Sequence, residues 1–163
     1  MSGTSTLFVS RMGELLISGF EQKESETWEA ATRGFVYNVA KEEYVLRGIN
    51  QPHSLQGDPA GGTLWNCESA ENRLISRGGR VQDFPSTYLR GLAFGKNAIY
   101  AASNKRRLFS KSAGKVRLYT NNDYRGECSI YKVPYRGGKV SGEIRKVVDS
   151  SDSTPEIYDL LRL

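Results

Sequence analysis

One histidine and one arginine are the residues of this chain best suited to bind or activate a small molecule. His53 is the only histidine, and because its unperturbed pKa lies near neutrality, its ring can serve as a general base or as a metal ligand. Arg90 stands just before Gly91, and a guanidinium can hold a carboxylate or a phosphate through two parallel hydrogen bonds. Each residue also has a structural alternative, in which His53 binds backbone groups and Arg90 pairs with Glu68 or Asp83.

A cluster of basic side chains between residues 105 and 117 is the second chemical feature. Tyr119 and Tyr124 follow it, and their rings can stack on bases, so the cluster indicates a site for single-stranded nucleic acid or another anion. Arg107 also repeats the position of Arg73 in the internal repeat described next, which favours a structural role for it. The basic residues of the cluster are Lys105, Arg106, Arg107, Lys111, Lys115 and Arg117.

An internal repeat indicates the architecture that positions these side chains. Residues 69–76 recur 34 positions later as residues 103–110, and four of the eight positions are identical. Repeats of about 35–45 residues that hold several short strands are typical of the blades of a β-propeller. The innermost strands of a propeller line a central channel, and polar side chains at their ends are natural binding residues. By this alignment, His53 and Arg90 stand at equivalent starts of inner strands.

The strand pattern divides the chain into three blades, at approximately residues 5–50, 51–89 and 90–149, followed by a tail at 150–163. Strands are expected where roughly 4–8 β-branched or aromatic residues stand between Gly, Pro, Asn or Asp. These segments are 7–10, 14–18, 34–39 and 44–47, then 53–55, 64–67, 73–76 and 80–84, then 91–94, 99–103, 129–133 and 142–147.

Other segments have defined places in this pattern. Residues 19–33 are expected to form a loop or a short helical turn, and residues 105–127 an insertion in the third blade. Gly78-Gly79 and Gly137-Gly138 fit tight hairpin turns. Trp65 and Tyr100 are expected in the core between blades.

Three blades do not close a ring, because propellers typically have roughly 4–8 blades. The expected fold is therefore all-β, a partial propeller of about three four-stranded antiparallel blades that belongs to a six-bladed ring. The missing half is expected in a longer gene product, which is the preferred arrangement, or in a second copy that forms a homodimer. A small closed ring, with the tail as a partial fourth blade, is the remaining alternative.

Charge is distributed unevenly along the chain, whose net charge is +5. Residues 1–89 carry 8 basic and 11 acidic side chains, a net of −3, whereas residues 90–163 carry 15 and 7, a net of +8. Such asymmetry indicates an anionic partner, or two edges of an assembly that attract each other, or a basic surface that only faces solvent.

The cysteines and the hydropathy pattern suggest a cellular location. Cys67 and Cys128 lie in apolar segments without a CxxC or Cys/His pattern, so buried free thiols are expected. No apolar run approaches the roughly 20 residues that a membrane span needs, and the first residues lack a signal-peptide pattern. A cytoplasmic location without a membrane partner is therefore expected.

Several motifs in order resemble those of an uncharacterised bacterial family of propeller-like proteins, known mainly as a domain of unknown function. The resemblance covers about residues 50–110, and because the family's members are longer, it implies that this chain is a piece of a larger ring. The family has no established activity, so the resemblance implies a fold and not a function. The motifs are Gln51-Pro52-His53-Ser54-Leu55, Leu64-Trp65, Glu68-Ser69, Arg90-Gly91-Leu92-Ala93-Phe94 and Ser103-Asn104-Lys105-Arg106-Arg107.

A more distant similarity, to six-bladed NHL-repeat and gluconolactonase-like propellers, implies a cation site. In gluconolactonase-like sites a divalent cation is held by Glu, Asn and Asp oxygens. The corresponding set here is Glu68, Asn72 and Asn104, whose hard oxygen ligands suit Ca²⁺ or Mg²⁺. We identify no counterpart of the catalytic Asp of that group in this chain.

Three functions follow from these observations, and catalysis is left open. The leading hypothesis is a binding module for a small molecule or a protein, without a cofactor, whose ligand-binding residues are His53, Glu68, Arg90, Asn104 and Lys105. The alternative is a metal-dependent lactonase or esterase with a cation at Glu68, Asn72 and Asn104. The second alternative is anion or nucleic-acid binding through residues 105–117, for which the case is weakest.

Overall fold

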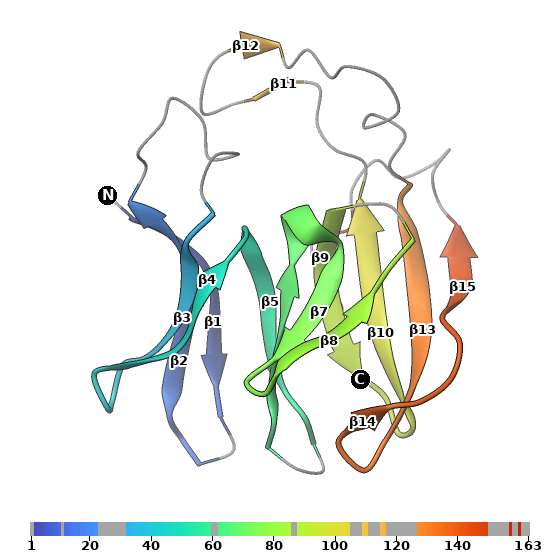
Figure 1. Ribbon diagram of the computed structural model, residues 1–163, viewed down its shortest axis with the longest axis horizontal. Coiled ribbons are helices and arrows are strands. Elements are labelled where there is room, and N and C mark those ends of the chain that lie inside the picture. The colour runs from blue at the N-terminus through green and yellow to red at the C-terminus, as the bar shows by residue number, and fades with distance from the viewer. Residues whose placement is uncertain are drawn as a thin grey trace.

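Alternating apolar and polar residues, separated by glycine-rich turns, fold the chain into antiparallel β-sheets (Figure 1). Within the part of the chain that the structure describes, the one helical element is a single 3₁₀ turn, Ser69–Glu71. No helix in this part is long and apolar enough to cross a membrane. The structure is a computed structural model that describes residues 2–10, 12–22, 32–59, 62–85, 88–104, 109–110, 115–116, 127–149, 157 and 160.

Three antiparallel sheets, each built on four successive main strands, follow one another along the chain. The first sheet contains β1 (Ser2–Val9), β2 (Leu15–Gln22), β3 (Gly34–Asn38) and β4 (Glu43–Ile49). The second contains β5 (Pro52–Gly57), β6 (Leu64–Glu68), β7 (Arg73–Ser76) and β8 (Gly79–Asp83). The third contains β9 (Tyr88–Phe94), β10 (Ala98–Asn104), β13 (Ser129–Arg136) and β15 (Arg145–Asp149), with the short β14 (Lys139–Val140) beside the end of β13. In the first two sheets each strand pairs with its neighbour in sequence, whereas in the third β10 pairs with β13 and β13 pairs with β15. A separate two-stranded hairpin is formed by β11 (Phe109–Ser110) and β12 (Lys115–Val116).

The three sheets pack face to face through two apolar cores. Leu16 and Val36 of the first sheet meet Leu55, Leu64 and Ile75 of the second in one core. The larger core joins the second sheet to the third. Its members include Trp65, Cys67, Leu74, Leu89, Leu92, Ile99, Tyr131, Val133 and Tyr135. The second sheet is thus covered on both faces, whereas the first and third are each covered by a neighbouring sheet on one face.

The first strands of the three sheets, β1, β5 and β9, lie side by side. Hydroxyl groups connect them, because the Ser54 backbone N–H donates to Thr6 Oγ1 at 3.1 Å and the Ser54 hydroxyl donates to the Arg90 carbonyl. Gly57 permits the closest approach of β5 to β1, since a Cβ there would lie 2.8 Å from the Phe8 ring. These contacts place one end of each sheet along a common inner edge.

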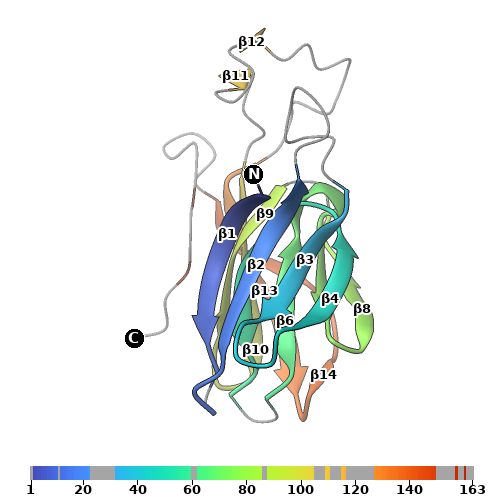
Figure 2. The same ribbon diagram turned by 90° about the vertical axis from the view of Figure 1, so that its left-hand side faces the viewer.

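The outer face of the first sheet is apolar. This face is turned away from the second sheet, as the arrangement of β1 to β4 in Figure 2 shows. In register across the strands, Leu7 pairs with Ile17, Ile17 with Tyr37 and Tyr37 with Tyr44. Leu7 is 67% exposed. The large apolar residues of this outer face are Leu7, Val9, Leu15, Ile17, Phe35, Tyr37, Val39 and Tyr44. This face has the composition of a buried sheet face, and none of the other sheets formed by the described residues covers it.

Most of the sequence expectations for the strands are met. The all-β class, the four-stranded antiparallel sheets and the turns at Gly78-Gly79 and Gly137-Gly138 are observed. Cys67 and Cys128 are buried thiols outside any disulfide bond, as expected. Trp65, 1% exposed, lies in the core as expected.

Two expectations are wrong in part. Tyr100 is half-buried and lies on the face of β10 opposite to Ile99 and Ala101, because side chains alternate along a strand. The start of the segment expected as a loop or helical turn continues β2 as far as Gln22. Residues 23–31 and most of residues 105–127 and of the tail lie outside the described residues.

Candidate functional site

Irregular backbone at the start of β5 positions His53 between the first and third sheets. Gln51 and Ser54 on either side of it have positive φ angles of 54° and 48°, a region that non-glycine residues seldom adopt. The register between β5 and β6 shifts after His53, which marks a β-bulge. The His53 ring lies edge-on to two aromatic rings, 5.5 Å from Phe20 of β2 and 5.6 Å from Tyr88 of β9.

Hydrogen bonds hold the His53 ring in one tautomer. Its Nδ1 lies 3.1 Å from the Gln51 carbonyl oxygen and 2.8 Å from Ser69 Oγ. Because a carbonyl oxygen only accepts, and because the Ser69 hydroxyl donates its proton to the Leu89 carbonyl, Nδ1 must carry the proton. The lone pair of the neutral ring therefore resides on Nε2.

The surroundings of His53 keep the ring neutral at physiological pH. Burial is the main cause, and the positive charge of Arg90 adds to it, so that the pKa of His53 falls from 6.5 to about 4. The hydrogen bond to the Gln51 carbonyl opposes this by favouring the protonated form. A neutral imidazole beside an arginine can accept a hydrogen bond at Nε2. In the chain itself, the His53 hydrogen bond to Ser69 joins β5 to the 3₁₀ turn, and the Ser69 hydroxyl continues the link to Leu89 of β9.

Glu68 belongs to the same end of the sheets but is engaged by the chain itself. Its carboxylate, on a residue 3% exposed, accepts the Asn50 backbone N–H at 2.8 Å and the Arg73 Nε–H at 2.5 Å. Asn50 donates in turn to Glu71 at 2.7 Å. Arg73 was not identified from the sequence as the partner of Glu68, although the β6–β7 register places the two residues directly opposite each other. The pair tightens the hairpin that carries Ser69.

The other expected site residues lie in different surroundings. Asn104 is 1% exposed, and its side-chain amide donates to the Ile157 carbonyl at 2.9 Å and accepts the Ile157 N–H at 2.6 Å. Asn72 ends the 3₁₀ turn in the left-handed region, with φ 55°. Lys105 and the remainder of the basic cluster up to Arg117, apart from Lys115, lie outside the described residues, and of Lys115 only the backbone is described.

Two of the three residues expected to hold a cation have their side-chain oxygens engaged by the chain, whereas Asn72 Oδ1 is buried without a hydrogen-bond partner among the described residues. Glu68 and Asn104 both spend their side-chain oxygens on groups of the chain. Among the residues described, no group of three or more His, Cys, Asp or Glu side chains is placed to hold a metal ion. Because the expected set contains only one carboxylate, this observation does not test it, and a cation at Glu68, Asn72 and Asn104 stays a prediction.

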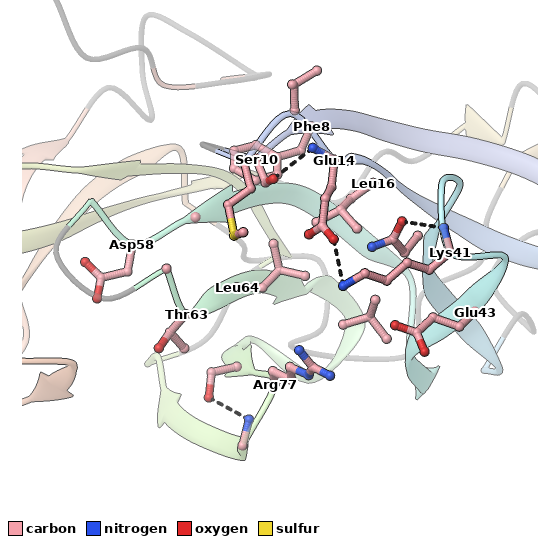
Figure 3. A pocket seen from close by; sticks show the side chains of 18 of the residues that line it. Phe8, Ser10, Glu14, Leu16, Lys41, Glu43, Asp58, Thr63, Leu64 and Arg77 are labelled. Carbon is pink, nitrogen blue, oxygen red and sulfur yellow. Dashed lines mark hydrogen bonds and ion pairs between the residues drawn. The ribbon is translucent and has the colours of Figure 1, made fainter.

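A pocket that sequence reasoning missed lies at the opposite end of β5 from His53 (Figure 3). It has a volume of about 760 Å³ and opens between the first and second sheets. Its walls come from four hairpin turns that are far apart in the sequence, so no local motif reveals it. The walls include Phe8, Met12, Glu14, Leu16, Lys41, Glu43, Val45, Asp58, Leu64 and Arg77.

Comparison of the chain with protein-family models, with curated proteins and with solved structures finds no match.

Proposed function

We propose that this chain is a protein-binding module, half of a six-bladed β-propeller that a second copy completes. The observation that carries the proposal is the uncovered apolar outer face of the first sheet. In this ring β1, β5 and β9 line the central channel, and His53 and Arg90 stand at its mouth. The order of the sheets supports the arrangement, since each has its first strand at the inner edge and its last strand furthest from it.

Inside the chain, apolar sheet faces are covered by the apolar face of a neighbouring sheet. The second sheet meets its neighbours through apolar cores on both faces. The outer face of the first sheet, with Leu7 and Tyr44 exposed, has no such neighbour among the described residues. Burying apolar area stabilises an assembly by about 25 cal/mol per Å², and large exposed apolar patches mark interaction surfaces.

The outer face of the third sheet supplies a matching surface. Strand alternation places Tyr100, Ile130 and Val148 on it, together with the cations of Lys132 and Arg145. Its apolar residues suit those of the first sheet. Its cations can form cation–π contacts with the rings of Phe35, Tyr37 and Tyr44. The Tyr44 ring already has such a contact within the chain, because Arg47 Cζ lies 3.7 Å from its centroid.

Charge favours a second copy as the partner. Residues 1–50 carry 5 basic and 7 acidic side chains, a net of −2, whereas residues 88–149 carry 14 and 4, a net of +10. Placing the first sheet of one copy against the third sheet of the other joins segments of opposite charge. A two-fold axis then forms both contacts at once and closes the ring.

The test is the effect of Leu7→Asp on the mass in solution. Leu7 is 67% exposed in the single chain, so the substitution should leave each chain of the dimer folded. Burial of an unpaired carboxylate in the apolar interface, however, should weaken the dimer strongly. We expect a folded monomer by sedimentation velocity and circular dichroism. The matched control is Asn97→Asp, which adds the same charge at an exposed turn between β9 and β10 and should remain dimeric. A Leu7→Asp chain as dimeric as the unmodified chain would overturn the proposal.

A further inference from the structure

The pocket between the first and second sheets combines an apolar floor with a charged rim (Figure 3). Phe8, Leu16 and Leu64 form part of the floor and belong to, or pack on, the core between these sheets. Met12, 88% exposed, contributes from the tip of the β1–β2 turn. A methionine there can adapt to ligands of different shape, because its side chain is flexible and polarisable. The volume of about 760 Å³ lies in the range of about 300–1,000 Å³ that small-molecule sites occupy.

Two of the charged groups on the rim neutralise each other. Lys41 Nζ lies 2.7 Å from Glu14 Oε1, and this contact raises the pKa of Lys41 and lowers that of Glu14. Glu43 adds a negative charge close to Lys41, which raises the Lys41 pKa further. The net charge on the side of the rim formed by the first sheet is therefore close to zero or slightly negative.

Arg77 supplies a cation from the other side of the rim. It is exposed at the β7–β8 turn, where its backbone N–H donates to the Leu64 carbonyl at 3.1 Å. Its charge reaches into the pocket, because it lowers the pKa of both Glu14 and Lys41. In the described part of the chain no hydrogen bond or ion pair is shown for its guanidinium, which makes it the available cation of the rim.

We infer that this pocket binds an amphipathic monocarboxylate, with its apolar body on Phe8, Leu16 and Leu64 and its carboxylate on Arg77. A guanidinium recognises a carboxylate through two parallel hydrogen bonds. The compensated Glu14–Lys41 pair and Glu43 on the facing wall disfavour a second negative charge, which restricts the ligand to a single acidic group. The site is distinct from the His53 end of the sheets and does not depend on a second copy.

Octanoate is the probe for this pocket, because it combines a carboxylate with a flexible apolar chain. Titration calorimetry of the full chain should show binding of octanoate. Acetate should not bind, because it lacks the apolar body, and octylamine should bind at least tenfold more weakly, because its charge is wrong. Arg77→Gln should weaken octanoate binding at least tenfold, since the variant loses the charge that strengthens the hydrogen bonds to the carboxylate.

The matched control is Arg136→Gln, an exposed arginine at the end of β13 that does not line the pocket. This variant should bind octanoate as the unmodified chain does. Absence of octanoate binding to the unmodified chain would overturn the inference. Equal binding of octylamine, or unchanged octanoate binding by Arg77→Gln, would also overturn it, because either result would mean that Arg77 does not select the ligand.

Discussion

The single histidine makes the pH dependence of stability a direct test of the His53 environment. The pKa of His53 is about 4 in the folded chain and 6.5 in the unfolded reference. Between these values the unfolded chain binds the extra proton, so stability falls as the pH is lowered through this window and levels off below it. Integrated from about pH 7 to about pH 4.5, the linkage amounts to about 2 kcal/mol of lost unfolding free energy.

His53→Asn separates this titration from the hydrogen bonds. The asparagine amide nitrogen takes the position of Nδ1 and can donate to Ser69 Oγ and the Gln51 carbonyl, but it has no proton to gain. Urea unfolding followed by tryptophan fluorescence should show a loss about 2 kcal/mol smaller for the variant than for the unmodified chain over the same pH interval. The carboxylates are common to both chains and cancel in the difference. Equal pH dependence of the two chains would refute the buried, neutral assignment.

Two further substitutions test the interior of the sheets. Glu68→Ala should lower the free energy of unfolding by about 2–3 kcal/mol, because the partly buried Asn50 backbone N–H and the Arg73 guanidinium both lose their acceptor. Added Ca²⁺ should not alter the stability of the unmodified chain, and stabilisation by Ca²⁺ would instead favour a metal role for Glu68. Trp65→Ala should cost about 3–5 kcal/mol in urea unfolding, since it leaves a cavity beside Phe94 and Tyr135. A loss below about 1 kcal/mol would contradict the position of Trp65 in the core.

The sheets were largely predictable from the sequence because their signals are local. Period-two alternation marks the buried faces of strands such as β3, and paired glycines at Gly78-Gly79 and Gly137-Gly138 mark hairpins. The 34-residue repeat then relates the second sheet to the third. The prediction for Tyr100 was wrong because the offset of 34 residues pairs Trp65 with Ile99 and not with Tyr100. Ile99 lies in the core with Trp65, and Tyr100 lies on the other face of β10.

The site was less predictable because its contacts are not local. Nothing near His53 in the sequence indicates that Ser69 and the Leu89 carbonyl complete its hydrogen bonds. Asn104 resembles a polar ligand at a strand end, yet it binds the backbone of Ile157, 53 residues away. The pocket at Arg77 is built from turns of two sheets, so it becomes visible only when those sheets are packed together.

The native mass of the unmodified chain tests the central claim most directly. Light scattering coupled to size exclusion at micromolar concentration should give about 36 kDa, twice the 18.2 kDa of one chain. This mass would mean that two half-rings cover each other's outer faces. A mass of 18.2 kDa that persists as the concentration is raised would contradict completion of the ring by a second copy.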